Sequence, residues 1–239
     1  MIIIPDTHGR DFWEKPVEEN LGKEHIIFLG DYLDPYAYEG IKRDVVFPRF
    51  ERIVEMKKKH PCDVTLLLGN HDLHYVDNNI GGSRYDYANA SRNKQFILGN
   101  AQCFQLAFTA KAGSKKILFT HAGLKLGWLK KHDDIFPADN AYAAAVTLNI
   151  MWSNSQFHEA LFHILADIPY SRWGNSRHGS PVWNDVEDMT TDKEEFPGWY
   201  QIFGHSQQES DPVIGEHIAC LDCRKAFRFI DNGVFEELL

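Results

Sequence analysis

Apolar runs of strand length recur along the first third of the chain, and polar residues follow each of them at once. Residues 2–4, 25–29 and 63–68 form such runs, and they do not alternate with polar positions. Short runs without alternation are typical of parallel strands that are buried on both faces. Residues 49–59 carry apolar side chains at helical spacing after Pro48, which predicts a helix that begins there. The pattern therefore predicts a βαβ arrangement, with polar segments at the carboxyl ends of the strands.

The second half of the chain combines shorter strand-like runs with two longer segments of helical periodicity. Residues 103–108 and 116–120 flank a turn and predict a hairpin, and residues 140–152 and 156–166 predict two helices. We expect the last four runs to form a β meander with a turn at Asp231-Asn232-Gly233, and these runs are 200–203, 217–221, 226–230 and 234–238. A second sheet is therefore expected.

Length and composition predict one globular domain that spans residues 1–239, since 44% of the chain is hydrophobic and one sizeable core can form. The net charge of −9 argues against broad capture of nucleic acid, which needs a lysine and arginine surface. No run approaches the roughly 18 apolar residues of a membrane span, and the N-terminus lacks the features of a signal peptide.

Cysteine usage bears on the compartment. Four cysteines are too few for a disulfide framework in a chain of this length, so we expect a soluble protein of the reducing cytoplasm. Cys220 and Cys223 form a Cys-x-x-Cys, which is compatible with half a zinc site or a redox pair. No second pair accompanies it, which favours a structural role.

Five short polar motifs stand where apolar runs end, and they are Asp6-Thr7-His8, Gly30-Asp31-Tyr32-Leu33-Asp34, Gly69-Asn70-His71-Asp72, Thr120-His121-Ala122-Gly123 and Gly204-His205-Ser206. Residues two apart in an extended chain point the same way, so Asp6 and His8 can reach one ion. Carboxylates and imidazoles gathered from several strand ends are how α/β proteins build dinuclear metal sites. Mixed nitrogen and oxygen ligands suit manganese, iron or zinc better than calcium. The motifs therefore predict a metal-dependent enzyme.

In this order and with these gaps, the motifs resemble those of the calcineurin-like metallophosphoesterases, nearest to the phosphoprotein phosphatase and diadenosine tetraphosphatase branch. The resemblance covers residues 6–206 and implies an α/β fold, a four-layer α/β/β/α sandwich of two mixed β-sheets flanked by helices. It also implies two divalent ions, with manganese expected and iron or zinc as alternatives, and attack on phosphorus by a hydroxide that bridges them.

The resemblance assigns a role to each motif residue. It implies six metal ligands, with Asp31 as the bridge between the ions, and they are Asp6, His8, Asp31, Asn70, His121 and His205. It further implies that His71 is the general acid that protonates the leaving oxygen and that Asp34 orients His71.

Two positions depart from the family pattern. Phosphoprotein phosphatases, which the motifs resemble, usually have one arginine directly after Gly-Asp-x-x-Asp and another just before Gly-Asn-His. These arginines bind the substrate phosphate. This chain has Pro35 and Leu68 at the two positions. We expect replacements from two long loops, 81–93 and 171–198, because long irregular connections often bind ligands. The candidates are Arg84, Arg92, Arg172 and Arg177.

Three further positions refine the comparison. Gln207 stands where the wider superfamily often has the second histidine of Gly-His-x-His, which weakens a nuclease interpretation. Asp72 replaces a glutamate that is common in eukaryotic phosphoprotein phosphatases, and we regard this change as neutral. His74 lies three residues after His71 and is close enough along the chain to touch the site.

We expect a phosphoesterase that hydrolyses a phosphomonoester or a small phosphoanhydride, with a phosphorylated small molecule, a nucleotide or a phosphoprotein as substrate. One alternative is a nuclease or a cyclic-phosphate phosphodiesterase, which the acidic charge balance disfavours. A second alternative is a non-catalytic scaffold that binds proteins with the same fold. The complete ligand set beside His71 and Asp34 favours an enzyme, because a scaffold needs no leaving-group acid.

Overall fold

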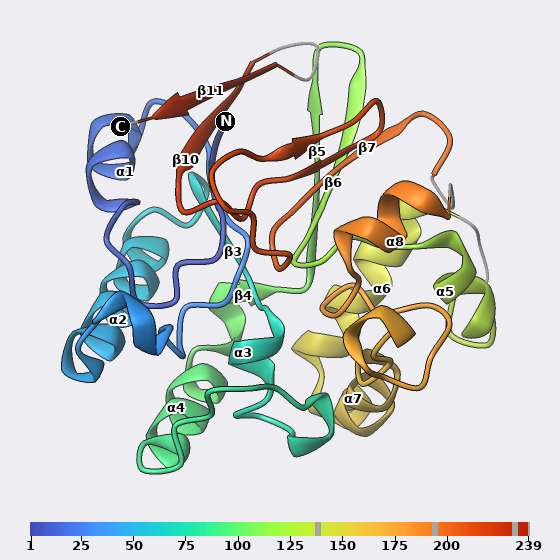
Figure 1. Cartoon of the computed structure of the whole chain (residues 1–239), viewed down its shortest axis with the longest axis horizontal. Coiled ribbons are helices and arrows are strands. Elements are labelled where there is room, and N and C mark those ends of the chain that lie inside the picture. Colours follow the sequence, from blue (N-terminus) through green and yellow to red (C-terminus); the bar gives the residue numbers. More distant parts are fainter. Residues whose placement is uncertain (137–139, 193–195, 231–233, 239) are drawn as a thin grey trace.

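The computed structural model describes residues 1–136, 140–192, 196–230 and 234–238, and in these residues two β-sheets are flanked by helices (Figure 1). The first sheet has the strand order β11-β10-β1-β2-β3-β4. Its strands are β1 (Ile2–Ile4), β2 (Ile26–Phe28), β3 (Val64–Leu67), β4 (Phe104–Gln105), β10 (Ala226–Ile230) and β11 (Val234–Leu238). The second sheet has the order β5-β6-β7-β9-β8. Its strands are β5 (Ala107–Ala112), β6 (Lys115–Thr120), β7 (Trp199–Phe203), β8 (Val213–Ile214) and β9 (Ile218–Cys220).

Both sheets are mixed. In the first, β1, β2, β3 and β4 run parallel, whereas β10 and β11 are antiparallel additions beside β1. In the second, β6, β7 and β9 run parallel, and the hairpin partner β5 and the short β8 are antiparallel to them. The predicted architecture of two mixed sheets flanked by helices is confirmed.

The non-alternating apolar runs are explained by burial on both faces of the first sheet. Ile2 and Ile4 of β1 belong to the core that also contains Trp13, Val17 and the apolar face of α2. Ile3 between them belongs to the other core, which lies between the sheets. Successive side chains point to opposite faces of a strand, so each residue of β1 is buried and no position is left for a polar side chain.

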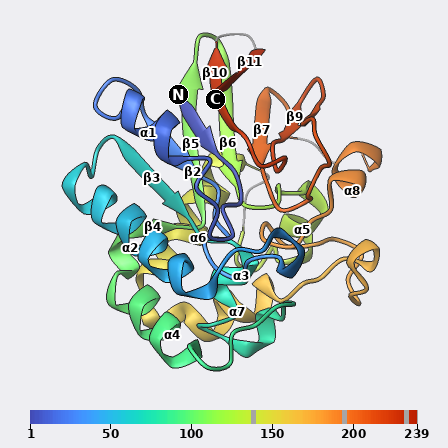
Figure 2. The same cartoon turned by 60° about the vertical axis from the view of Figure 1, so that its left-hand side comes forward.

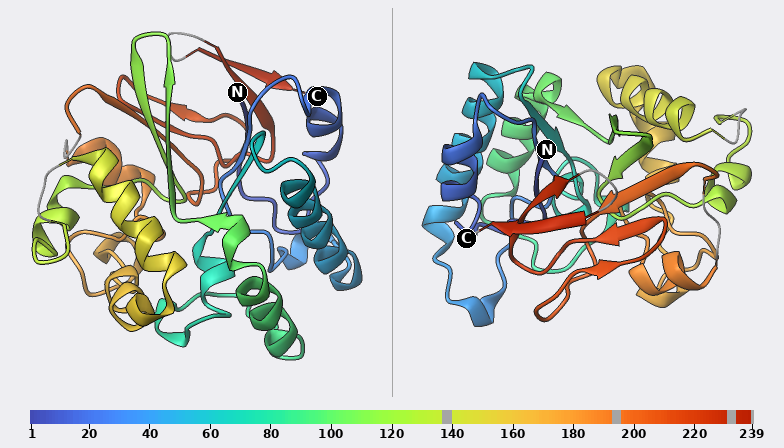
Figure 3. Two further views of the ribbon diagram at one scale, coloured as in Figure 1. Left: turned by 180° about the vertical axis from the view of Figure 1, so that it is seen from behind. Right: turned by 90° about the horizontal axis from the view of Figure 1, so that it is seen from above.

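Helices cover the outer faces. They are α1 (Glu14–Asn20), α2 (Arg43–Lys59), α3 (Asn70–Leu73), α4 (Ala90–Gly99), α5 (Leu126–Lys131), α6 (Ala141–Ser153), α7 (His158–Leu165) and α8 (Val186–Thr191). The first sheet packs against α1 and α2, and the second against α6 and α8. In Figures 1 and 2, α4 and α7 lie at the opposite end of the molecule from β11, and Figure 3 shows α6 and α7 side by side from behind.

The helix predicted at 49–59 begins earlier than expected, at Arg43, and Pro48 lies inside it. Proline lacks the N–H that would bond to the carbonyl of Asp44. Asp44 is exposed, so water can satisfy that carbonyl and the helix continues through the proline.

The hairpin predicted at 103–108 and 116–120 is partly wrong, because the first segment divides between the sheets. Phe104–Gln105 joins the first sheet as β4, and β5 begins at Ala107. Asn149 of α6 bridges the division, since its Oδ1 accepts the N–H groups of Leu106 at 2.9 Å and Ala107 at 3.2 Å. The Asn149 side chain replaces strand pairing where the chain passes from the first sheet to the second. The sequence around residues 104–107 does not indicate this interaction.

The predicted β meander is partly wrong, since only its last two runs pair antiparallel as expected, as β10 and β11. β7 and β9 are parallel rather than antiparallel, and β10 returns to the first sheet, where Ile2 pairs with Arg228. The free edge of β1 and the burial of Phe227 and Phe229 in the core between the sheets account for this crossing. The turn predicted at Asp231-Asn232-Gly233 lies outside the described residues. Of the two segments expected to be irregular, one contains the start of α4 and the other contains α8.

None of the helices in the described part of the chain is long and apolar enough to cross a lipid bilayer.

Candidate metal centre

The five motifs come together where the parallel strands of the two sheets end. β1, β2 and β3 of the first sheet, and β6 and β7 of the second, each end within three residues of a motif ligand. The described residues form three buried groups of potential ligand atoms, each with its atoms within 4.8 Å of one another, and two of these groups share Asp31. The first comprises Asp6, His8 and Asp31, and the second comprises Asp31, His121 and His205.

Asn70 completes the set of six predicted ligands. Its Oδ1 lies 3.2 Å from Nε2 of His121. Asp31 belongs to both groups, and its Oδ2 lies 3.6 Å from Nε2 of His8 and 3.5 Å from Nε2 of His121. The structure therefore brings all six residues together, with Asp31 in the middle.

The backbone is strained at this point of the fold. Among the described residues, seven non-glycine residues have positive φ, and five of them are predicted site residues, namely His8, Asp31, Asp34, Arg84 and His205. Such conformations cost of order 1–3 kcal/mol each and persist where surrounding structure over-determines them. Their concentration here indicates that the positions of the site side chains require strained backbone conformations.

Two motif glycines allow the close approach of the loops. A Cβ on Gly69 would collide with the carboxylate of Asp31 and the ring of His121. A Cβ on Gly204 would collide with the carboxylate of Asp6. Glycine is required at both positions because ligand side chains occupy the space that any larger residue would fill.

Main-chain carbonyls fix the tautomers of two histidines. Nδ1 of His8 lies 2.7 Å from the carbonyl oxygen of Leu33, and Nδ1 of His121 lies 2.9 Å from that of Leu29. A carbonyl only accepts, so each Nδ1 carries the proton and each neutral ring keeps an unprotonated Nε2 that faces Asp31. Fixing the tautomer through the second nitrogen is how proteins orient metal-ligating histidines.

Burial shapes the charge of the cluster. It raises the pKa of Asp31 to about 8 and that of Asp6 to about 6. It lowers the pKa values of His8, His121 and His205. The imidazoles are therefore neutral near pH 7. These five side chains thus provide too little positive charge to offset the desolvation of the two buried carboxylates. Unprotonated nitrogens facing carboxylate and amide oxygens across about 3.5 Å fit divalent cations of the manganese, iron or zinc type.

Beside this cluster, Asp34 is the centre of a second buried group. Its Oδ2 accepts from Nδ1 of His71 at 2.9 Å, and Nε2 of His74 lies 2.7 Å from the same oxygen. Its Oδ1 accepts from the hydroxyl of Tyr75. Burial alone would raise the pKa of Asp34, but the hydrogen bonds from the two histidines outweigh it and lower the pKa. Asp34 is therefore ionised and holds the ring of His71 in one orientation.

Sequence reasoning underrated Asp72. Its carboxylate is fully buried, and it accepts three main-chain N–H groups, from Gly69 at 2.9 Å, Asp31 at 2.8 Å and Tyr32 at 3.0 Å. The loop after β2 is thereby tied to the loop after β3. Asp72 positions the bridging ligand candidate, and its place in the motif Gly-Asn-His-Asp was the available signal.

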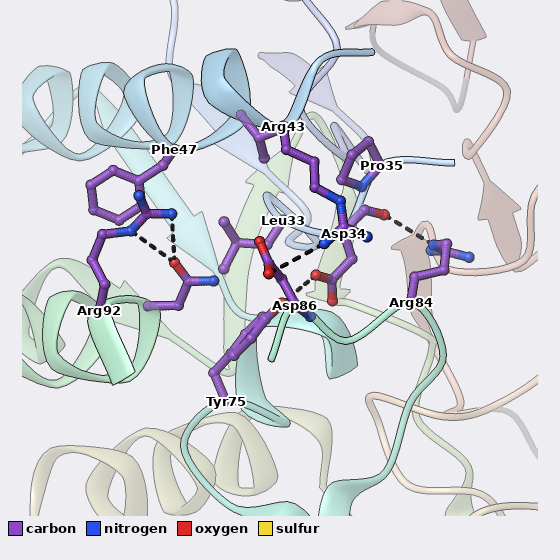
Figure 4. Close-up of a pocket in the computed structure, with 11 residues that line it drawn as sticks. Leu33, Asp34, Pro35, Arg43, Phe47, Tyr75, Arg84, Asp86 and Arg92 are labelled. Atoms are coloured by element: carbon purple, nitrogen blue, oxygen red, sulfur yellow. Dashed lines mark hydrogen bonds and ion pairs between the residues drawn. The ribbon is translucent and has the colours of Figure 1, made fainter. Parts of the chain in front are cut away.

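The four candidate arginines lie in different places. Nη2 of Arg84 lies 3.1 Å from Nε2 of His71. Arg172 donates to the hydroxyl of Ser206, next to His205, at 2.7 Å and pairs with Asp185. Arg92 instead stacks on Phe47 at 3.9 Å, on the far side of Asp34 from Arg84 (Figure 4). Arg177 is exposed, and its charge helps to lower the pKa of Asp192. Only Arg84 and Arg172 adjoin the cluster.

Two mixed sheets with a buried group of metal-type ligands at their carboxyl ends define an α/β sandwich protein with a candidate metal centre. The family model described as calcineurin-like phosphoesterase matches residues 1–209, which include all five motifs. The chain therefore belongs to the calcineurin-like phosphoesterase family, as the resemblance of its motifs predicted.

Solved structures share this fold at low sequence identity. The cold-active protein-tyrosine phosphatase of a Shewanella species is 15% identical, with a TM-score of 0.53, and the alignment covers 100% of this chain and 80% of that one. A protein serine/threonine phosphatase from Saccharomyces cerevisiae is 14% identical, with a TM-score of 0.55, and the alignment covers 99% of this chain and 78% of that one. No curated protein sequence matches this chain significantly. Family membership supports a hydrolase.

Proposed function

We propose that this protein is a dinuclear metal-dependent phosphoesterase that hydrolyses a phosphomonoester or a small phosphoanhydride. The observation that carries the proposal is the position of the Asp31 carboxylate, which faces unprotonated imidazole nitrogens of His8 and His121 on two sides. Neutral imidazoles cannot balance a buried carboxylate, whereas two divalent cations would.

Six side chains would hold the ions. Asp6, His8 and Asp31 would bind one ion, and Asp31, Asn70, His121 and His205 the other. When bound, two such ions lower the pKa of a water molecule toward neutrality and neutralise charge on the phosphoryl oxygens. Mn²⁺ is the first ion to test, with iron and zinc as alternatives.

His71 would protonate the leaving oxygen. Its Nδ1 is committed to Asp34 and its Nε2 points to Arg84, so Nε2 is the atom available for proton transfer. Burial lowers the pKa of His71 to about 4, and Arg84 acts in the same direction against Asp34. His71 is thus neutral in the substrate-free protein, and an incoming phosphate dianion would favour its protonated form.

The other two candidate functions have less support. A nuclease or cyclic-phosphate phosphodiesterase needs a surface that attracts nucleic acid, and the net charge is −9. A non-catalytic scaffold would not need the Asp34–His71 pair beside the ligands. We also place the protein in the cytoplasm, because its four cysteines are all free.

Protein reconstituted with Mn²⁺ should hydrolyse p-nitrophenyl phosphate, phosphopeptides or dinucleoside polyphosphates, and His71→Asn should lower kcat by roughly 10²- to 10⁴-fold. Metal content, measured by elemental analysis, should stay the same because His71 is not among the ligands. Hydrolysis of bis(p-nitrophenyl) phosphate alone would favour a phosphodiesterase. No hydrolysis with two metals bound would favour the scaffold.

A further inference from the structure

The guanidinium of Arg84 lies against the metal centre candidate, at the side of the leaving-group histidine. Its Nη2 is 3.1 Å from Nε2 of His71 and 3.4 Å from Nε2 of His8. Its Nε donates to the carbonyl oxygen of Asp34 at 3.0 Å, and its plane lies over the ring of Tyr36 at 3.7 Å. Figure 4 shows the side chain reaching back toward Asp34. The guanidinium is therefore held in one place from two sides.

Arg84 has no carboxylate partner among the residues that the structure describes. Other arginines nearby are neutralised, since Arg43 pairs with Asp86 and Arg172 with Asp185. Arg84 also adopts a left-handed backbone conformation, with φ of 60°. A half-buried cation that is fixed in a strained loop but lacks a counter-ion is arranged for an anion from outside.

The anchor of Arg84 lies next to Pro35 in the chain. In the phosphoprotein phosphatases, which the motifs resemble, a phosphate-gripping arginine stands directly after the second aspartate of Gly-Asp-x-x-Asp, and here that position is Pro35. Arg84 is bonded to the carbonyl of Asp34, the residue immediately before it. A guanidinium from the loop after α3 is thus delivered to the same turn of the chain.

We propose that Arg84 binds the phosphoryl group of the substrate and selects a monoester over a diester. The proposal rests on the proposed function. A monoester has three terminal oxygens and up to two negative charges, so it can offer oxygens to the fork of an arginine as well as to the cations. A diester has two terminal oxygens and one charge, and it leaves the fork without a good partner.

The test compares Arg84→Ala and Arg84→Lys with Arg92→Ala. Arg92 is a matched control because it also stacks on an aromatic ring, that of Phe47, but its guanidinium donates to Asn93 and not to a residue of the ligand cluster. In Mn²⁺-loaded protein, Arg84→Ala should raise KM for p-nitrophenyl phosphate and the inhibition constant of inorganic phosphate by roughly 10- to 100-fold, the worth of charge-assisted hydrogen bonds. Arg84→Lys should be intermediate, because lysine keeps the charge and loses the fork. Arg92→Ala should match the wild type.

Selectivity supplies the second readout. Turnover of bis(p-nitrophenyl) phosphate should change far less than that of the monoester in Arg84→Ala. Equal losses toward both esters, loss of metal from the variant, or unchanged phosphate inhibition would overturn the proposal while His71→Asn could still support the phosphoesterase. If the wild type hydrolyses neither ester, the proposed function fails. Calorimetric binding of inorganic phosphate to the Mn²⁺-loaded wild type and Arg84→Ala would then decide the role of Arg84 alone.

Discussion

The Asp72 carboxylate connects the loop that carries Asp31 to the loop that carries Asn70, and Asp72→Asn tests how much this connection contributes. The side chains of aspartate and asparagine have the same shape, so packing is preserved. In the native protein, Oδ2 accepts two N–H groups, from Gly69 and Asp31, and Oδ1 accepts one, from Tyr32. An amide has a single oxygen, so its NH₂ group must face at least one main-chain N–H.

The magnitude follows from the three bonds. Hydrogen bonds to a charged group contribute about 1.5–3 kcal/mol each, and those between neutral groups about 0.5–1.5 kcal/mol. Burial and the nearby Asp31 raise the pKa of Asp72, against the three N–H groups that favour its ionised form. With the carboxylate ionised and the amide oxygen in the place of Oδ2, one charge-assisted bond is lost and two become neutral, which costs about 3.5–6 kcal/mol in the free energy of unfolding. Proteins have about 5–15 kcal/mol in total, so the variant should still fold. Tm should fall by about 7–24 °C, at 2–4 °C per kcal/mol for a chain of this size.

Two assays measure the effect. Differential scanning calorimetry gives Tm, and equilibrium dialysis with Mn²⁺ should show metal affinity lower by roughly 10- to 100-fold, as for other residues that orient ligands. Asp77→Asn is the control, because Asp77 accepts one N–H at the start of a short 3-10 helix on the surface. If Asp72→Asn and Asp77→Asn shift Tm and affinity equally, the loops are not held by this carboxylate.

Two further predictions concern charge. Chelation of divalent ions should lower Tm, because Asp6 and Asp31 are buried and their pKa values are raised in the metal-free protein. A divalent ion at about 100 times its Kd stabilises the folded protein by about 2.7 kcal/mol. Equal Tm values with Mn²⁺ and with chelator would contradict a metal centre. Asp167→Asn should destabilise by about 1–2 kcal/mol at neutral pH, because Asp167 accepts from Lys131 and His132. These bonds outweigh burial and lower the pKa of Asp167, so its contribution is complete above 3.8 and is lost as the pH falls through the folded-state value. Urea titrations at neutral pH and below 3.8 measure this, and a difference that does not shrink in acid would refute it.

The parallel strands β1, β2 and β3 of the first sheet were predictable because their signal in the sequence is local. The runs that became β1, β2 and β3 are buried on both faces, so all their positions except Thr65 are apolar and the strand signal is strong. Polar ligands then stand out at the strand ends. The six ligand candidates were found in this way, before any contact between them was known.

The other strands of both sheets were harder to predict because strand partners are chosen over long distances. The run at 226–230 resembles a meander strand, yet β10 pairs with β1 at the other end of the sequence. The division between β4 and β5 depends on Asn149, which lies more than forty residues further on. Local patterns identify a strand, but they do not identify the edge to which it binds.

The candidate site shows the same limit at the level of side chains. Four arginines in two loops were equivalent in the sequence, and only the fold separates Arg84 from Arg92. The distinguishing features are a carbonyl at Asp34 and a ring at Tyr36, about fifty residues earlier in the chain. Asp34 is the last residue of Gly-Asp-x-x-Asp, and Tyr36 lies two residues after it. Pro35, which stands where an arginine is absent, therefore lies in the same turn as the two groups that hold Arg84. Arg84 can thus compensate for the missing arginine.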